Sequence, residues 1–187
     1  MATESDETGL IDVLTLAFSS DPMARWSQPN PHQYLAHFPV LAKAFGGNAF
    51  AQGTAYLADG YAGAALWLPP GYGPDEETMI GLVERTAPEA IKSEIYGVFE
   101  EMGKYHPTEE HWYLPLIGVD PSQQGKGIGS ALMKRALADC DRDGTIAYLE
   151  SSNPRNISLY KRHGFEVSGE IQVGSSPTMY PMLRKAR

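Results

Sequence analysis

The feature that most constrains this chain is the glycine-rich run Gln124-Gly125-Lys126-Gly127-Ile128-Gly129-Ser130, which separates an apolar segment from a segment with helical periodicity. Glycine tolerates positive φ angles and lets backbone N–H groups approach a ligand closely. The first turn of a following helix adds unpaired N–H donors and the positive end of the helix dipole. The run therefore predicts a loop that binds a pyrophosphate.

Two commoner glycine loops do not fit the spacing. A P-loop needs Gly-Lys-Ser/Thr five places after its first glycine, and Gly125 is not followed by that sequence. A dinucleotide-binding loop needs a glycine three places after Gly127, where Ser130 stands instead. The pattern that remains is Gln124-x-x-Gly127-x-Gly129, and the competing interpretation is that its glycines only make a tight connection.

This pattern, preceded by Val119-Asp120-Pro121, resembles the coenzyme A loop of the GNAT superfamily of acetyltransferases. Further motifs follow in that superfamily's order: Tyr148-Leu149-Glu150-Ser151-Ser152, then Asn153-Pro154-Arg155-Asn156, then Leu159-Tyr160-Lys161-Arg162-His163-Gly164-Phe165. The resemblance implies one α/β domain over residues 1–187, with a mixed, mostly antiparallel central sheet flanked by helices. It also implies a splayed strand pair that binds coenzyme A. Residues 1–105 would form the acceptor side and residues 106–187 the acetyl-CoA-binding half.

Within the superfamily the chain most resembles puromycin N-acetyltransferase and its relatives. The likeness is strongest over about residues 106–170 and is carried by His106-Pro107, His111-Trp112-Tyr113-Leu114 and the motifs above, with Leu16-Ala17-Phe18 and Asp21-Pro22 nearer the amino end. One departure is that residues 1–8 have almost no apolar sequence for the fold's usual first strand. That strand is expected to be missing or short. The resemblance does not make puromycin the substrate, because variable segments set acceptor specificity.

The composition excludes several other classes of protein. A formal net charge of -8 over 187 residues disfavours a nucleic-acid partner, which would require a basic stripe. No apolar run approaches the ~18 residues of a membrane span, and the amino terminus lacks a signal-peptide layout, so we expect a cytoplasmic protein with no membrane partner. The single cysteine, Cys140, falls on the apolar face of a helix and is expected to be buried. The five histidines have no metal-binding spacing, so no metal is predicted.

Periodicity and breaker residues predict the following elements. Helices are expected at 8–20, at 32–45 with a kink or break at Pro39, at 75–105 with an interruption near Pro88, at 128–143 ending at Gly144, and from an Asn153 N-cap to Gly164. Strands are expected at 50–58 and 61–68, as a hairpin around Asp59-Gly60, and at 111–119, 145–150, 165–173 and 178–185. Residues 21–31 are predicted as a loop, and the helices of 75–105 are expected to cover the sheet and border the acceptor pocket.

The glycine loop and the strand before it supply the expected acetyl-CoA contacts. By the resemblance, pantetheine pairs with the backbone of the strand, the Val119 N–H faces the thioester oxygen and the Asn156 amide contacts the pantetheine arm. A solvated asparagine at a helix start is the alternative for Asn156. The predicted cofactor-binding residues are Ile117, Gly118, Val119, Gln124, Gly125, Lys126, Gly127, Ile128, Gly129, Ser130 and Asn156.

Two residues are candidates for proton transfer. By the resemblance, Tyr160 occupies the position of the general acid, and a phenol with a pKa near ~10 can protonate a departing thiolate of pKa ~8.5. A core tyrosine is the alternative. Glu150, at a strand end, is the candidate base for the amine, either directly or through water. It has a structural alternative, and His106 or His111 could replace it as base.

These features predict an acetyl-CoA-dependent N-acetyltransferase that acts on a primary amine of a small molecule by direct attack in a ternary complex. The alternative class is a coenzyme-A-binding sensor or interaction module without turnover. Acetylation of a protein amino terminus or lysine would need a peptide groove, which the sequence does not indicate. A homodimer is left open.

Overall fold

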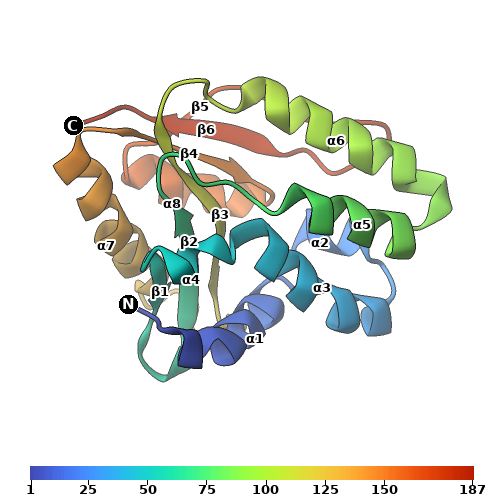
Figure 1. The fold of residues 1–187 in the computed structure, drawn as a ribbon, viewed down its shortest axis with the longest axis horizontal. Coiled ribbons are helices and arrows are strands. Elements are labelled where there is room, and N and C mark those ends of the chain that lie inside the picture. The colour runs from blue at the N-terminus through green and yellow to red at the C-terminus, as the bar shows by residue number, and fades with distance from the viewer.

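Six strands form one mixed sheet in the computed structural model, which describes residues 1–187 (Figure 1). The strand order is β1-β2-β3-β4-β6-β5, and only the β3–β4 pair is parallel. The mixed, mostly antiparallel sheet that the resemblance implied is therefore confirmed. The strands are β1 (Ala55–Leu57), β2 (Gly63–Leu68), β3 (His111–Val119), β4 (Ile146–Ser151), β5 (Glu166–Val167) and β6 (Tyr180–Arg184).

The parallel pair splays apart within β3. Residues His111 to Tyr113 pair with β4, whereas the rest of β3 pairs only with β2. The β2–β3 register shifts in the stretch between Tyr113 and Leu116, which contains Pro115. A bulge bends a strand, and proline has no N–H to donate to a neighbouring strand. Pro115 therefore gives a physical reason for the divergence, and the expected splayed pair is confirmed.

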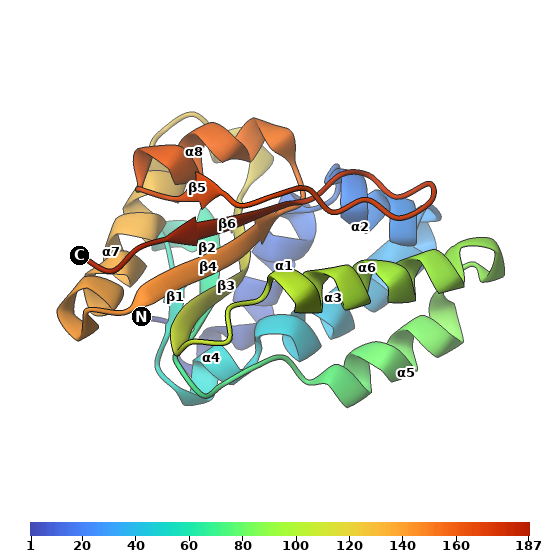
Figure 2. The same ribbon diagram turned by 90° about the horizontal axis from the view of Figure 1, so that it is seen from above.

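Helices cover both faces of the sheet, and each face has its own apolar core. On one face, α1 and α3 bury Leu10, Leu14 and Phe38 against the sheet; on the other, α7 and α8 bury Met133 and Tyr160. Figure 2 shows these two layers on opposite sides of the strands. The helices are α1 (Glu7–Ala17), α2 (Pro22–Ser27), α3 (Pro31–Gly46), α4 (Asn48–Ala51), α5 (Glu76–Thr86), α6 (Lys92–Tyr105), α7 (Ile128–Asp143) and α8 (Ile157–Arg162).

The sequence of helix α7 explains both its buried face and the position of its end. Its buried residues recur at helical spacing, and it ends at Gly144, whose φ of 61° is the left-handed conformation expected after a helix. Cys140 lies on this buried face, as predicted, and burial raises the pKa of its thiol to about 12.

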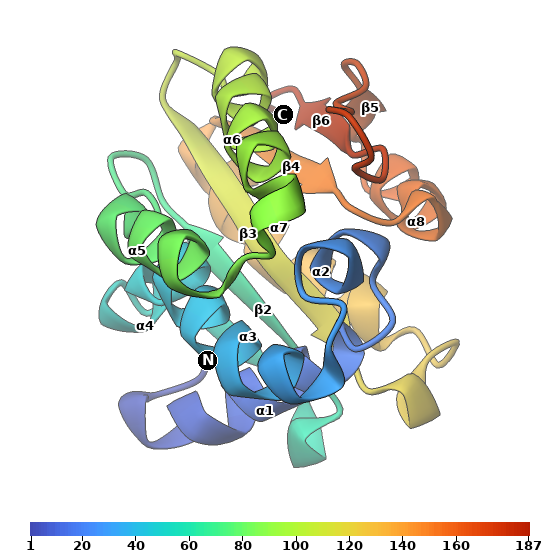
Figure 3. The ribbon, with the colours of Figure 1, turned by 90° about the vertical axis from the view of Figure 1, so that its right-hand side faces the viewer.

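Helices α2, α3, α5 and α6 surround the side of β3 that faces the viewer in Figure 3. Helix α5 packs on α3, and α6 follows α5 after a short turn that contains Pro88. The helical prediction for 75–105, with its interruption near Pro88, is therefore confirmed, and the segment forms two helices. None of the helices is long and apolar enough to cross a membrane.

Three local predictions were wrong. Residues 22–27 form α2 rather than a loop, because Asp21 accepts hydrogen bonds from the Met23 and Ala24 N–H groups and so caps a helix that begins at a proline. Residues 48–51 form α4 rather than the start of a strand. The strand predicted at 165–173 is reduced to β5 (Glu166–Val167) and an isolated bridge at Ile171. Helix α3 is not broken at Pro39, because the burial of residues such as Tyr34 and Phe38 in the same helix offsets the lost hydrogen bond.

The amino-terminal segment has no strand, in agreement with the prediction from its apolar-poor sequence. The Ala2 N–H donates to the Ala55 carbonyl of β1, at 2.8 Å, and a 3-10 turn follows at Glu4–Asp6. The hairpin of β1 and β2 is confirmed in position, but its turn includes a 3-10 turn at Asp59–Tyr61 rather than two residues alone.

Candidate functional site

A polar cleft of about 490 Å³ opens where β3 and β4 diverge. One wall is the glycine loop together with the end of β3 that has no β4 partner. The other wall is the segment from Asn153 to Arg162, which includes α8. The cleft brings together most of the predicted cofactor residues, although they are far apart in the chain. Those that line it are Ile117, Gly118, Val119, Gln124, Gly125, Gly127, Ile128, Gly129, Ser130 and Asn156.

The glycine loop exposes its backbone to this cleft. Gly125 and Gly127 have φ angles of 77° and 82°, which non-glycine residues rarely adopt, and a side chain at either position would meet no atom within 4 Å. Helix α7 begins immediately after Gly127, so its first N–H groups have no acceptor within the helix. These amides and the helix dipole form a concave donor surface suited to phosphate oxygens.

Two polar side chains of the loop bond within the protein. Gln124 Nε2 donates to the Val119 carbonyl at 3.2 Å, and this ties the loop to the end of β3. Lys126 Nζ donates to Gln123 Oε1 at 2.8 Å, and Lys126 does not line the cleft. Lys126 is therefore the one predicted cofactor residue that the structure does not bring to the cleft wall.

Tyr160 lies both in the core and in the wall of the polar cleft. Its side chain is 5% exposed and packs edge-on against Phe165 in the α7 core, yet the residue lines the polar cleft. Burial raises the pKa of its phenol above the usual range, and the charge of Asp21 raises the pKa further. The phenol is therefore protonated at neutral pH and is available as a proton donor.

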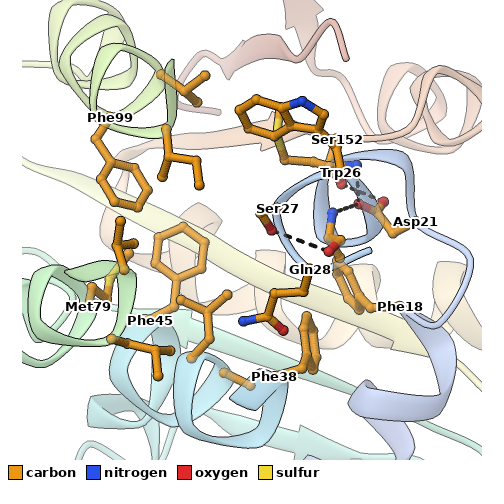
Figure 4. A pocket seen from close by; sticks show the side chains of 18 of the residues that line it. Phe18, Asp21, Trp26, Ser27, Gln28, Phe38, Phe45, Met79, Phe99 and Ser152 are labelled. Carbon is orange, nitrogen blue, oxygen red and sulfur yellow. Dashed lines mark hydrogen bonds between the residues drawn. The ribbon is translucent and has the colours of Figure 1, made fainter. Parts of the chain in front are cut away.

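An apolar pocket lies on the α1–α3 side of the sheet, and its volume is about 140 Å³ (Figure 4). Aromatic and other apolar side chains from α2, α3, α5 and α6 form most of its wall, and Figure 4 shows several of them pointing toward a common centre. Those labelled in the figure include Trp26, Phe38, Phe45, Met79 and Phe99.

Glu150 is the acidic residue at the sheet end of this pocket. Its side chain is only 4% exposed. Tyr113 Oη donates to Glu150 Oε2 at 2.8 Å, whereas Glu150 Oε1 is buried without a hydrogen-bond partner in the protein. A buried, unpartnered carboxylate oxygen is energetically unfavourable unless a ligand satisfies it.

His106 and His111, the two alternative bases, lie beside Glu150. The distance from His106 Nδ1 to Glu150 Oε1 is 3.9 Å, and the Nε2 atoms of the two histidines are 2.9 Å apart. His111 Nδ1 lies 2.7 Å from the Glu109 carbonyl oxygen, and burial lowers the pKa of the His111 ring. The three candidates are thus neighbours in one chain of groups that runs from the pocket toward the loop before β3.

Asp21 was missed as a site residue. It lines both the cleft and the pocket, as does Phe18. Ser152 Oγ donates to Asp21 Oδ2 at 2.7 Å, and burial raises the pKa of the Asp21 carboxyl. The available signal was the Asp-Pro pair, which marks a helix N-cap as well as a break.

Two arginines of the cleft were also missed. Arg155 and Arg162 line the wall opposite the glycine loop, where both are exposed. Their guanidinium groups supply local positive charge in a chain whose formal net charge is -8. Ser130 Oγ lies 2.9 Å from His163 Nε2, so the start of α7 also contacts the residue that follows α8.

The chain is similar to known acetyltransferases. The profile described as Acetyltransferase (GNAT) family matches residues 55–165. An uncharacterized N-acetyltransferase of Schizosaccharomyces pombe is 29% identical over 134 residues, which cover 65% of this chain and 54% of that protein. An L-amino acid N-acyltransferase of Escherichia coli is 31% identical over 84 residues, which cover 43% of this chain and 46% of that protein. The chain thus spans about half the length of these curated relatives.

A similarity in fold extends over the whole chain. The crystal structure of histone acetyltransferase HPA2 and related acetyltransferase from Corynebacterium glutamicum superposes with a TM-score of 0.70 at 24% identity. It covers 100% of this chain and 94% of its own. The overall fold described above is therefore shared with that solved structure.

Proposed function

Because the chain belongs to the GNAT family of acetyltransferases, we propose that it transfers the acetyl group of acetyl-CoA to a primary amine of a small molecule, by direct attack in a ternary complex. The observation that carries this proposal is the meeting of two different cavities. The polar cleft has the glycine loop, the apolar pocket has Glu150, and both cavities share Phe18 and Asp21. Two substrates bound in these cavities would meet where β3 and β4 diverge.

The cleft fits acetyl-CoA on its own chemistry. The amides from Gln124 to Ser130 would hold the pyrophosphate, with Arg155 and Arg162 opposite. The part of β3 that lacks a β4 partner, including Ile117 and Val119, offers backbone groups to the amides of pantetheine. Asn156, on the opposite wall, would contact the same arm through its side chain.

Each chemical step is assigned to a residue that lines one of the two cavities. As the amine nitrogen bonds to the thioester carbon, the carbonyl oxygen gains negative charge, and the Val119 N–H would stabilise it. A preorganised donor of this kind contributes about 3 kcal/mol. When the carbon–sulfur bond breaks, the electron pair stays on sulfur, and Tyr160 would donate its phenolic proton there. The nitrogen loses its second proton as the amide forms, and that proton would restore the Tyr160 phenol.

The ammonium of the acceptor must lose a proton before it can attack. Glu150 Oε1 would accept that proton, because it is buried in the pocket wall and has no donor of its own. His106 and His111 would then pass the proton toward the surface. His106 Nδ1 lies 3.9 Å from Glu150 Oε1, and the Nε2 atoms of the two histidines are 2.9 Å apart. In this proposal the three candidate bases act in sequence.

Several finer points belong to the same proposal. A pocket of about 140 Å³ suits a small molecule better than a peptide chain. A relationship with puromycin N-acetyltransferase rests on the motifs alone, and a puromycin-like acceptor is one candidate among small amines.

The decisive test measures release of free thiol from acetyl-CoA across a panel of amines that includes aminonucleosides, polyamines, amino acids, arylalkylamines and a lysine peptide. We expect turnover with at least one small primary amine and none with the peptide. Calorimetry with acetyl-CoA is run in parallel. Binding without turnover across the whole panel would contradict the proposal and support a coenzyme-A-binding module instead.

A further inference from the structure

The apolar pocket contains a polar group, the side-chain amide of Gln28, to which the proposed catalytic steps assign no role. Gln28 follows the last residue of α2, is 7% exposed, and lines the pocket. Its backbone N–H donates to the Ala24 carbonyl at 3.1 Å and completes the helix end. Figure 4 shows its side-chain amide between Phe38 and Phe45, directed into the space that the aromatic residues enclose.

The amide oxygen of Gln28 is buried without a partner in the protein. Leaving such a group unpaired destabilises the protein, and an apolar residue of the same shape would avoid this penalty. Six buried side-chain atoms of the molecule lack a partner, and the only two that line the apolar pocket are Gln28 Oε1 and Glu150 Oε1. The pocket therefore contains two unpartnered polar atoms within a mostly apolar wall.

The volume of the pocket limits what can lie between these two contacts. An apolar cavity of about 150 Å³ holds a benzene molecule, and the pocket measures about 140 Å³. Five of the lining residues are aromatic and most of the others are aliphatic, which favours an apolar body of ring size over a long polar chain.

We propose that Gln28 is a specificity-determining residue, and that the acceptor is a primary amine on a ring-sized apolar body that also carries a hydroxyl or amide group. The amine lies toward Glu150, the ring lies among the aromatic side chains, and the hydroxyl or amide donates to Gln28. This inference rests on the proposed function, because it names the acceptor of the same reaction.

The test compares ligands that differ only in the polar group. Binding of 2-phenylethylamine, its 3-hydroxyl and 4-hydroxyl derivatives, and phenylalanine amide is measured by calorimetry with the protein saturated in coenzyme A. We expect at least one hydroxyl or amide compound to bind about tenfold or more tightly than 2-phenylethylamine, because the unsubstituted ring leaves the Gln28 amide unpaired.

Gln28→Leu should abolish this preference while keeping or improving the binding of 2-phenylethylamine. Gln28→Met serves as a second variant of similar length should the leucine variant fold poorly, and melting temperatures report on folding. The control is Gln33→Leu on the exposed surface of α3, which should leave every affinity unchanged. Equal wild-type affinities, no binding of any compound, or a preference that survives both Gln28 variants would overturn the inference. Because binding is measured without turnover, this outcome is separate from a failure of acetyl transfer.

Discussion

The two cavities are built from different parts of the chain and by different means. One wall of the polar cleft exposes backbone: the glycine loop, the start of α7 and the edge of β3 that has no β4 partner. The apolar pocket is formed by side chains from helices α2, α3, α5 and α6, which are distant in sequence. Backbone binding needs a local motif, whereas a side-chain pocket depends on long-range packing. Substitutions outside the local motif can therefore change the apolar pocket and leave the glycine loop unchanged.

The largest expected effect concerns Tyr160, which serves both the cleft and the core. Tyr160→Phe should reduce turnover by about 10²-fold or more while acetyl-CoA affinity is nearly kept, because the hydroxyl is needed only as the thiolate forms. Steady-state kinetics and calorimetry check the two quantities.

Tyr56→Phe is the matched control. The Tyr56 hydroxyl donates to Asp139 at 2.7 Å, away from both cavities, so its loss should lower stability and leave turnover intact. If Tyr160→Phe retained full turnover, Tyr160 would have only a packing role.

The next prediction tests whether the backbone of the glycine loop binds the phosphate groups of acetyl-CoA. Gly127→Val should weaken acetyl-CoA binding by about tenfold or more, since a β-branched residue strains a position with φ of 82° and puts bulk where phosphate approaches. Gly144→Val is the control, because Gly144 is also left-handed and open but lies at the far end of α7. The control should lose stability and keep its affinity. Equal affinities in the two variants would contradict the phosphate-binding assignment.

The glycine-loop wall of the cleft was predictable from the sequence because it is formed by a short local pattern of glycines. Positive φ at Gly125 and Gly127, the start of α7 and the stop at Gly144 are all local consequences of short sequence patterns. The ordered motifs after the loop located the opposite wall. The sequence pattern did not indicate that Lys126 lies outside the cleft wall, because the direction of its side chain depends on its hydrogen-bond partner, Gln123.

The pocket was much less predictable. Gln28 and Asp21 are more than 90 residues from Glu150 in the chain, and no local pattern reveals that they line one cavity. Helix α2 itself was read as a loop, although Asp21 and Pro22 are a helix-start signal. Pro115 within a strand was a further unused signal, because it marks the bulge at which β3 leaves β4.

A smaller effect is expected in the pocket, at the proposed base. Glu150→Gln should lower the rate by about tenfold at saturating acetyl-CoA and change the rising, acidic limb of the pH–rate profile, because the amide cannot accept the amine proton. Glu166→Gln, an exposed change in β5, is the control and should alter neither quantity. An unchanged profile with a lowered melting temperature would show that Glu150 is structural, and would leave His106, His111 or water as the proton acceptor.

The smallest expected effect lies at Asp21, where the two cavities meet, and it concerns stability rather than rate. Burial raises the pKa of Asp21 in the folded protein. Between the unfolded value of about 3.9 and this higher folded value, the folded state binds more protons than the unfolded state, so Asp21 makes stability fall as pH rises. Asparagine caps a helix about as well and does not titrate. The melting temperature of Asp21→Asn should therefore rise relative to wild type as pH increases from about 3 through this range.

Asp75 is a control whose effect on the pH dependence of stability should have the opposite sign. It caps α5 at the surface, and hydrogen bonds from Thr78 lower the pKa of its carboxyl. A lowered folded pKa contributes stability above the unfolded value and loses it as pH falls, so Asp75→Asn should lose melting temperature relative to wild type as pH rises. Melting curves of both variants at matched pH values give the comparison directly. The same sign for both would mean that Asp21 is as well solvated as Asp75, and that the junction of the two cavities is open to water rather than closed around the reacting groups.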